Sequence, residues 1–168
     1  MQNKSPDRRD FLRWKWLKGA ATSMFDPADF GDPVNTASYS LCIYHGGALL
    51  EEVHVPAGGT CGSKPCWKPL RNHLVPPPRL LRAYKYKYKD KKRLTNGVMK
   101  LLLRGGTEGK AKVVFKAKGP NLPDLELGLN EPVVVELINS ETSVCFSDSY
   151  SGSAIRFNDD RKFKAKNK

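Results

Sequence analysis

The sequence predicts an all-β fold, an antiparallel two-sheet sandwich, and three observations lead to this prediction. Several short segments alternate apolar and polar residues, as half-buried strands do. Turn signals rich in Gly and Pro separate most of these segments. No segment of ten or more residues repeats with the period of an amphipathic helix. A partly closed β-barrel is the alternative arrangement for strands of this length and spacing.

The individual strands follow from local alternation. Tyrosine and lysine alternate over residues 84–89, which places the two residue types on opposite faces of a strand. Gly46 and Gly47 form a two-residue turn signal between two apolar segments, as expected for a hairpin. The expected strands cover residues 11–17, 38–44, 49–55, 84–89, 98–103, 111–117, 132–138, 143–147 and 162–166.

The domain organisation follows from length and composition. A chain of 168 residues suits one domain and can bury a core without a metal. We expect a disordered polar tail over residues 1–10 and a single sandwich domain over residues 11–168. Residues 69–83 contain three consecutive prolines, so they are expected to form an extended insertion at the surface.

No export signal or membrane span is evident in the sequence. Arg8-Arg9 resembles the start of a twin-arginine signal, but Arg13, Lys15 and Lys18 interrupt the segment that should be apolar. Trp14 and Trp16 alternate with lysines there, which favours a strand. No stretch approaches the roughly 18 apolar residues needed to cross a bilayer.

The four cysteines are candidates for two disulfides, and three pairings are possible. Cys61 and Cys66 flank a short turn, which favours a local bridge between them. Cys42 and Cys145 lie in apolar strand-like segments and could join the two sheets. Four residues separate Cys61 from Cys66, which is a wider spacing than structural zinc knuckles usually have, so no metal is expected. Free cysteines would instead indicate a reducing, cytoplasmic compartment.

Charge points to an anionic partner. The chain contains 29 Lys and Arg against 17 Asp and Glu, a formal net charge of +12. Fourteen of the basic residues lie within residues 79–118, where Asp90 and Glu108 are the only acids. The candidate anion-binding residues are Lys85, Lys87, Lys89, Lys91, Lys92, Arg93, Lys112 and Lys116. A lysine-rich solvated strand face that discourages aggregation is the structural alternative.

Signals for catalysis are weak. Only His45, His54 and His73 could act as imidazole bases, and no nucleophile-elbow sequence occurs. Carboxylates are scarce and scattered, which argues against a paired-carboxylate glycosidase site. We therefore expect no enzymatic activity, no catalytic residues and no cofactor.

A resemblance covers roughly residues 10–168. The motifs that carry it, in order, are Leu12-Arg13-Trp14-Lys15-Trp16, Val55-Pro56-Ala57-Gly58-Gly59, Pro65-Cys66-Trp67-Lys68, Tyr86-Lys87-Tyr88-Lys89-Asp90-Lys91 and Phe163-Lys164-Ala165-Lys166. Their order resembles a domain of uncharacterised, secreted, β-rich bacterial proteins. That resemblance implies export and an all-β fold, and it implies no reaction or binding residue. The sequence departs from the pattern at the insertion over residues 69–83 and at Phe146, where Trp is expected.

Three functions follow as expectations. The first is a non-enzymatic extracytoplasmic module for adhesion, surface assembly or ligand presentation, within a longer chain or a multimer. The second is an anion-binding module for nucleic acid or acidic polysaccharide, acting through the basic face around residues 79–118. The third is a carbohydrate-binding module, which would need Trp14, Trp16 or Trp67 to be exposed. The expected partner is an anionic polymer or a cell-surface component.

Overall fold

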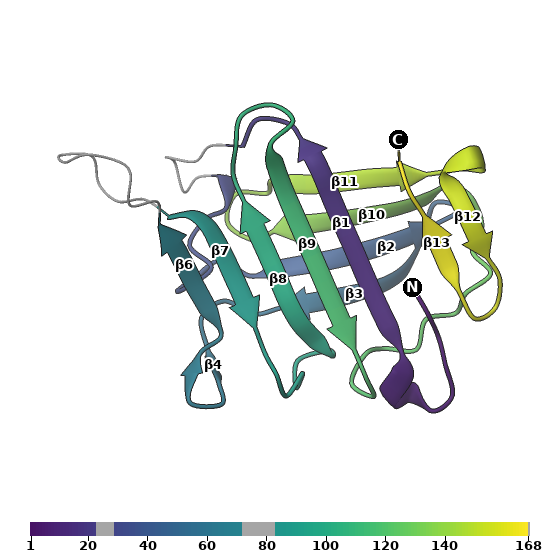
Figure 1. The fold of residues 1–168 in the computed structure, drawn as a ribbon, viewed down its shortest axis with the longest axis horizontal. Helices are drawn as coiled ribbons and strands as arrows, with labels where there is room; N and C mark the ends of the chain where they lie inside the picture. The colour runs from purple at the N-terminus through teal and green to yellow at the C-terminus, as the bar shows by residue number, and fades with distance from the viewer. Residues whose placement is uncertain (23–28, 72–82, 168) are drawn as a thin grey trace.

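Two antiparallel sheets form the protein. The computed structural model describes residues 1–22, 29–71 and 83–167. Five strands in the order β1-β9-β8-β7-β6 form one sheet, and four strands in the order β11-β10-β2-β3 form the other (Figure 1). The bounds in the first sheet are β1 Phe11–Gly19, β6 Trp67–Arg71, β7 Ala83–Lys89, β8 Val98–Arg104 and β9 Ala111–Lys118. Those in the second are β2 Tyr39–His45, β3 Ala48–Val55, β10 Val133–Asn139 and β11 Cys145–Tyr150.

Both sheets belong to a sandwich, as the alternation of the sequence predicts. In β9 and β10 buried and partly exposed residues alternate along the strand, so one face of each strand points into the core. The sheets cross one another and are not closed into a barrel among the described strands, so the barrel alternative is wrong (Figure 1). The physical reason is that β6 and β3 end their sheets without pairing to each other.

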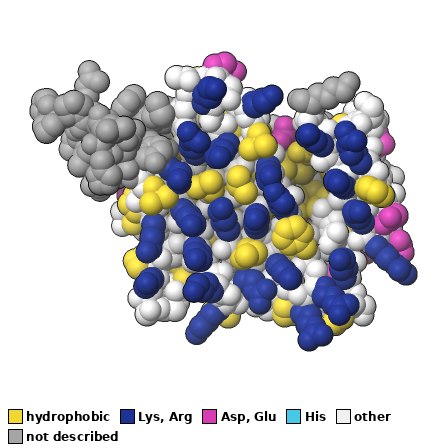
Figure 2. Space-filling view, viewed as in Figure 1, with side chains coloured by type: hydrophobic (Ala, Val, Ile, Leu, Met, Phe, Trp, Pro, Cys, Tyr) yellow, Lys and Arg dark blue, Asp and Glu magenta, His cyan; other side chains and the backbone are white. Residues whose placement is uncertain are grey.

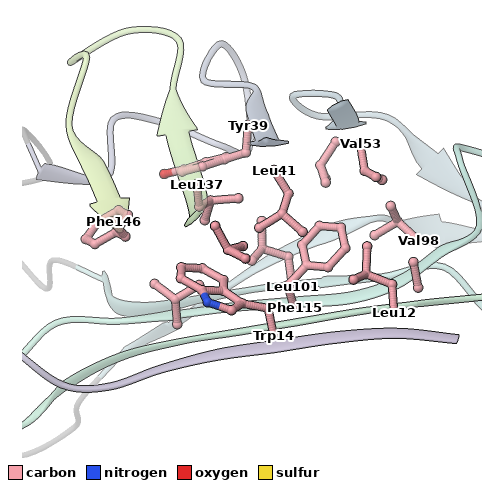
Figure 3. Close-up of a cluster of buried hydrophobic side chains, with 14 of the residues drawn as sticks. Leu12, Trp14, Tyr39, Leu41, Val53, Val98, Leu101, Phe115, Leu137 and Phe146 are labelled. Atoms are coloured by element: carbon pink, nitrogen blue, oxygen red, sulfur yellow. The ribbon is translucent and has the colours of Figure 1, made fainter. Parts of the chain in front are cut away.

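The core lies between the sheets and is built from large apolar side chains. Leu101 and Phe115 of the five-stranded sheet face Leu41 and Leu137 of the four-stranded sheet, and all four are fully buried (Figure 3). Aromatic pairs extend this packing, with Trp67 lying 5.4 Å from Tyr88 and 5.9 Å from Tyr39 between ring centroids. Burial of this apolar surface is the main force that holds the two sheets together.

The strand assignments agree with the sequence except in short segments. Two small sheets complete the fold, β4 (Thr60–Cys61) with β5 (Lys64–Pro65) and β12 (Ile155–Asn158) with β13 (Phe163–Ala165). The sequence did not predict β4, β5, β6 or β12, because pieces of two to five residues carry little alternation. In the expected insertion over residues 69–83, residues 69–71 belong to β6, and residues 72–82 lie outside the described part of the chain.

The amino-terminal residues differ from the predicted disordered tail. Gln2 exchanges backbone hydrogen bonds of 2.8 and 3.0 Å with Phe11 of β1. Gln2 also pairs with Lys162, just before β13, so it lies between these two segments. The buried Asp10 accepts a hydrogen bond from the Lys4 backbone at 2.6 Å. These partners are distant in the sequence, which is why local composition could not reveal them.

The disulfide predictions are half confirmed. Cys61 and Cys66 form a disulfide, as the short turn between them suggested. Cys42 and Cys145 are free, so the predicted bridge between the two sheets is wrong. Both belong to the four-stranded sheet, on β2 and β11, with β10 between these strands. Two strand spacings amount to about 9.6 Å, which is beyond the Cα separation that a disulfide can span.

Candidate anion-binding face

The outer side of the five-stranded sheet carries a dense array of basic side chains. We call this surface the basic face, and its described basic residues are Arg13, Lys15, Lys68, Lys85, Lys87, Lys89, Lys100, Arg104, Lys112, Lys116 and Lys118. The five strands, with the bounds given above, contain no Asp or Glu. Lys and Arg side chains spread over the whole of this side, with apolar patches between them (Figure 2). The surface therefore has a single sign of charge.

Like charges face each other directly across neighbouring strands of the basic face. Lys100 of β8 is the cross-strand partner of Lys89 on one side and of Lys116 on the other. Lys116 also pairs with Arg13 of β1. Like charges directly opposite one another destabilise an antiparallel pair. The folded protein thus retains a repulsion that a mixed-charge surface would avoid.

The pKa of Lys100 is affected by these neighbouring positive charges. Burial lowers the pKa of its ammonium group, and the nearby charges of Lys87 and Lys116 lower it further. Among the described side chains, Arg161 and Asp160 form an ion pair. This pair lies in the turn between β12 and β13 and not on the basic face. An anionic ligand would relieve the repulsion at Lys100.

The other sheet has the opposite charge. Strands β2, β3, β10 and β11 contain no Lys or Arg within their described bounds. Their acidic residues are Glu51, Glu52, Glu136 and Asp148. The sandwich is therefore polarised, and an approaching polyanion is attracted to one side and repelled by the other.

The structure brings together five of the eight predicted anion-binding residues. Lys85, Lys87 and Lys89 on β7 and Lys112 and Lys116 on β9 all belong to the basic face. Their strands are separated by β8, whose own Lys100 and Arg104 fill the space between them. These two and Lys118 lie within the predicted basic stretch over residues 79–118 but were not among the eight named residues, whereas Arg13, Lys15 and Lys68 were missed altogether. The alternation in residues 11–17 already placed Arg13 and Lys15 on a polar face, but only strand order places that face beside β9.

The remaining three predicted residues lie in the loop between β7 and β8. Asp90 accepts backbone hydrogen bonds of 2.8 Å from Lys92 and from Leu94, which fixes the path of this loop. Lys91 and Lys92 are exposed at the end of the sheet, and the backbone of Arg93 accepts a hydrogen bond from Asn121 at 3.0 Å. They extend the basic face at its edge but are not part of its cross-strand array.

Among the described side chains, the tyrosine and tryptophan rings of the five-stranded sheet do not form part of the basic face. Tyr86 and Tyr88 are buried on the inner side of β7, as the alternation with lysine predicts. Trp14 and Trp67 are 4% and 1% exposed, so neither offers a ring on which a sugar or base could stack. Trp16 is partly buried against Phe146, with ring centroids 5.2 Å apart. None of the three tryptophans that the carbohydrate-binding alternative would use is therefore fully exposed.

Other clusters of polar groups are present outside the basic face. Ser40 Oγ lies 3.4 Å from His54 Nδ1 on the exposed side of the four-stranded sheet. Both side chains are at the surface, and Nδ1 is the ring nitrogen of His54 that faces Ser40. Asp7, Asp10 and Asp124 also approach one another within 4.8 Å. Cys61 and Cys66 are joined to each other, which excludes them as zinc ligands in this state.

Fold and charge together define this chain as a β-sandwich with one strongly basic sheet. Comparison with protein-family models, curated proteins and solved structures finds no match to it. Within the described residues, no helix is long and apolar enough to cross a membrane. The disulfide between Cys61 and Cys66 is compatible with an extracytoplasmic location.

Proposed function

We propose that this protein is a non-enzymatic, extracytoplasmic module that binds an acidic polysaccharide through the basic face. One observation carries the proposal: directly opposed like charges, such as Lys100 with Lys116, are kept on a sheet whose strands contain no acid. This arrangement lowers the stability of the free protein. Bound sulfates or carboxylates would neutralise it, so the free energy lost in the fold is recovered in the complex.

Two features favour a polysaccharide over a nucleic acid as the polyanion. Single-stranded nucleic acid is usually bound by aromatic side chains that stack on bases, whereas Tyr86 and Tyr88 lie inside the core. A disulfide suits an oxidising compartment, where acidic polysaccharides of cell surfaces are available. Such binding would attach the module to an anionic surface, consistent with a role in adhesion or surface assembly.

Heparin serves as the test polyanion. A variant combining Lys87→Gln, Lys100→Gln and Lys116→Gln removes three charges from the centre of the basic face. We expect elution from heparin at clearly lower salt. The slope of log affinity against log salt should fall by up to about three, since each lost contact releases one counterion fewer.

The matched control removes the same number of charges elsewhere. Lys4, Lys64 and Lys110 are exposed and lie outside the cross-strand array. Replacing these three lysines by Gln gives a variant with the same net charge as the variant of the basic face. This variant should bind heparin like the wild type. Equal weakening by both variants would show that only net charge matters and would contradict the proposed face. Tighter binding of duplex DNA than of heparin at the same salt would favour a nucleic-acid function instead.

A further inference from the structure

Strand β1 lies at the edge of its sheet. Along most of its outer side, its backbone N–H and C=O groups make no hydrogen bonds to another described strand. Gly119 donates a backbone hydrogen bond to Asp10, so even-numbered residues of this segment bond toward β9. Phe11, by contrast, bonds away from β9, to Gln2. Since bonding direction alternates along an antiparallel strand, the N–H and C=O groups of Arg13, Lys15 and Leu17 point to the free edge.

The gap between β1 and the segment that contains β13 is wide enough for one additional strand. At one end of the interval Gln2 fills this space, since it pairs with both Phe11 and Lys162. Met1 continues this line, with its backbone carbonyl accepting a hydrogen bond of 3.1 Å from Phe163. Met1 and Gln2 thus lie as a short extended segment between the two edges. Past Met1, β1 and β13 continue side by side with an interval between them (Figure 1).

A cavity of about 670 Å³ occupies that interval, and we call it the edge slot. Leu12, Trp14, Val135, Tyr150 and Phe163 line its inner side, and all five are buried. In Figure 2 a hollow floored by apolar side chains is visible beside the basic face. Its size lies within the range of about 300–1,000 Å³ that is usual for ligand pockets. The floor can accept apolar side chains.

The floor also holds a hydrogen-bond donor that is only weakly satisfied. The indole Nε1 of the buried Trp14 makes no hydrogen bond of normal geometry with a described residue. Its N–H lies toward the Tyr150 hydroxyl, and this weak hydrogen bond opposes the rise in the pKa of that phenol, which burial and then Asp148 cause. The Tyr150 hydroxyl itself donates to Asp148 at 3.2 Å. A buried N–H without a well-formed hydrogen bond is rare in proteins, and here it belongs to a residue that lines the slot.

Both edges of the slot repeat the same pattern of side chains. On β1, Leu12 and Trp14 point inward, while Arg13 and Lys15 are exposed. On the opposite edge Phe163 is buried, and Lys164 and Lys166 are exposed. A strand placed between them would have its side chains alternate in step with both neighbours, because cross-strand partners share a face. Its outward residues would meet basic groups from both sides, and its inward residues would meet the apolar floor.

We propose that the edge slot binds an extended peptide segment of a partner protein in which acidic and apolar residues alternate, by adding it as a strand to β1. Backbone hydrogen bonds from Arg13, Lys15 and Leu17 provide affinity, and alternate side chains provide specificity. Acidic side chains lie between the basic groups of β1 and those following Phe163. The same lysines repel a second copy of the β1 edge, so self-pairing through it is disfavoured. This inference goes beyond polysaccharide binding, which uses side chains of the basic face and no backbone groups.

The first test uses a fluorescein-labelled synthetic peptide of alternating Glu and Val. A matched peptide carries N-methyl groups on the backbone amides that would face β1, so it has the same charge but cannot pair as a strand. We expect the methylated peptide to bind at least about tenfold more weakly, since backbone hydrogen bonds are lost. A peptide with all Glu residues before all Val residues should also bind weakly. Equal binding of all three peptides would show that they are held only by electrostatic attraction to the basic face, and this result would overturn the proposal.

Hydrogen exchange on the wild-type protein provides a readout that needs no variant. Amides of Arg13, Lys15 and Leu17 should exchange rapidly in the free protein and slowly when the alternating peptide is bound. Amides of Leu12 and Trp14, which bond toward β9, serve as internal controls because they are protected in both states. Binding without new protection at the three edge amides would contradict strand addition.

A pair of substitutions at Lys15 separates backbone from charge. Lys15→Pro removes one edge N–H at a position where an edge strand tolerates proline, and Lys15→Gln removes only the charge. Lys15→Pro should abolish binding of the alternating peptide, whereas Lys15→Gln should weaken it only a few-fold. Circular dichroism checks that both variants are folded. Equal effects of the two variants would argue against a role for the backbone.

Discussion

Lys100 and Lys116 lie directly opposite each other on β8 and β9, with both side chains on the outer side of the sheet. Lys89 flanks Lys100 on the other side. Three like charges in one row across neighbouring strands are unfavourable for the isolated protein. The basic face therefore couples folding stability to the concentration of salt and of anionic ligands.

The substitution Lys100→Gln should stabilise the free protein while weakening heparin binding. The pKa of Lys100 is lowered in the folded state, so its protonated form is disfavoured relative to the unfolded chain. This penalty is complete at neutral pH and fades as the pH rises through the lowered pKa. We expect a gain of about 0.5 kcal/mol in the free energy of unfolding at low salt, measured by urea denaturation. The gain should shrink at high salt, and Lys64→Gln is the exposed control.

Two buried tryptophans should respond differently to replacement by phenylalanine. Trp67 donates a hydrogen bond of 2.8 Å from Nε1 to the Pro56 carbonyl, whereas Trp14 Nε1 makes only a weak contact with the Tyr150 hydroxyl. Trp67→Phe loses this bond and some packing, so we expect a loss of about 2 kcal/mol. Trp14→Phe loses similar packing but no hydrogen bond of normal geometry, so its loss should be smaller, about 1 kcal/mol. Urea unfolding of both variants checks this order, and a larger loss for Trp14→Phe would contradict it.

Alkylation should distinguish the two free cysteines from the two that form the disulfide. In denaturant without reductant, only Cys42 and Cys145 should be labelled, because Cys61 and Cys66 are joined. In the folded protein the exposed Cys145 should react before the buried Cys42, and both slowly at neutral pH because burial raises their pKa values. Intact mass measures the labels. Four labelled cysteines would contradict the disulfide.

Removing the disulfide should have a moderate effect. The bridge closes a short loop, with a sequence separation of 5 between its cysteines. Chain entropy for such a loop predicts a loss of about 2 kcal/mol in the variant with both Cys61→Ala and Cys66→Ala. Urea unfolding of this variant against Cys145→Ala, which changes a free cysteine, gives the comparison.

Asp148 should make stability depend on pH in the acidic range. It lies on β11 and lines the edge slot, and burial raises the pKa of its carboxyl group, while hydrogen bonds from Tyr150 and Asn167 oppose this rise. A raised pKa means that the folded protein holds this proton more tightly than the unfolded chain. Its ionisation therefore lowers stability as the pH rises from 3.8, the ordinary pKa of an aspartate, through the raised pKa. Asp148→Asn should raise the melting temperature at neutral pH, and the difference should disappear near pH 3. A difference that persists there would contradict this origin.

Local pattern determined much of the fold. Alternation in residues 84–89 predicted β7 and the inward direction of Tyr86 and Tyr88, because side-chain direction along a strand depends only on the extended backbone. The same holds for the strand over β10 and for the hairpin at Gly46 and Gly47, where both glycines have positive φ angles of 54° and 85°. The Cys61–Cys66 bridge was predictable because its partners are close in sequence.

Strand order, by contrast, was decided by tertiary structure. The sequence placed basic residues around 79–118 but could not show that β1, distant in the chain, pairs with β9 and adds Arg13 and Lys15 to the same face. Nor could it show that Cys42 and Cys145 lie in one sheet, or that Gln2 lies between Phe11 and Lys162. Such neighbours are selected by packing of the whole core, because alternation states which face of a strand is buried and not which strand lies beside it. The sequence by itself therefore determined the strands and the basic charge, and the tertiary structure decided the basic face and the edge slot.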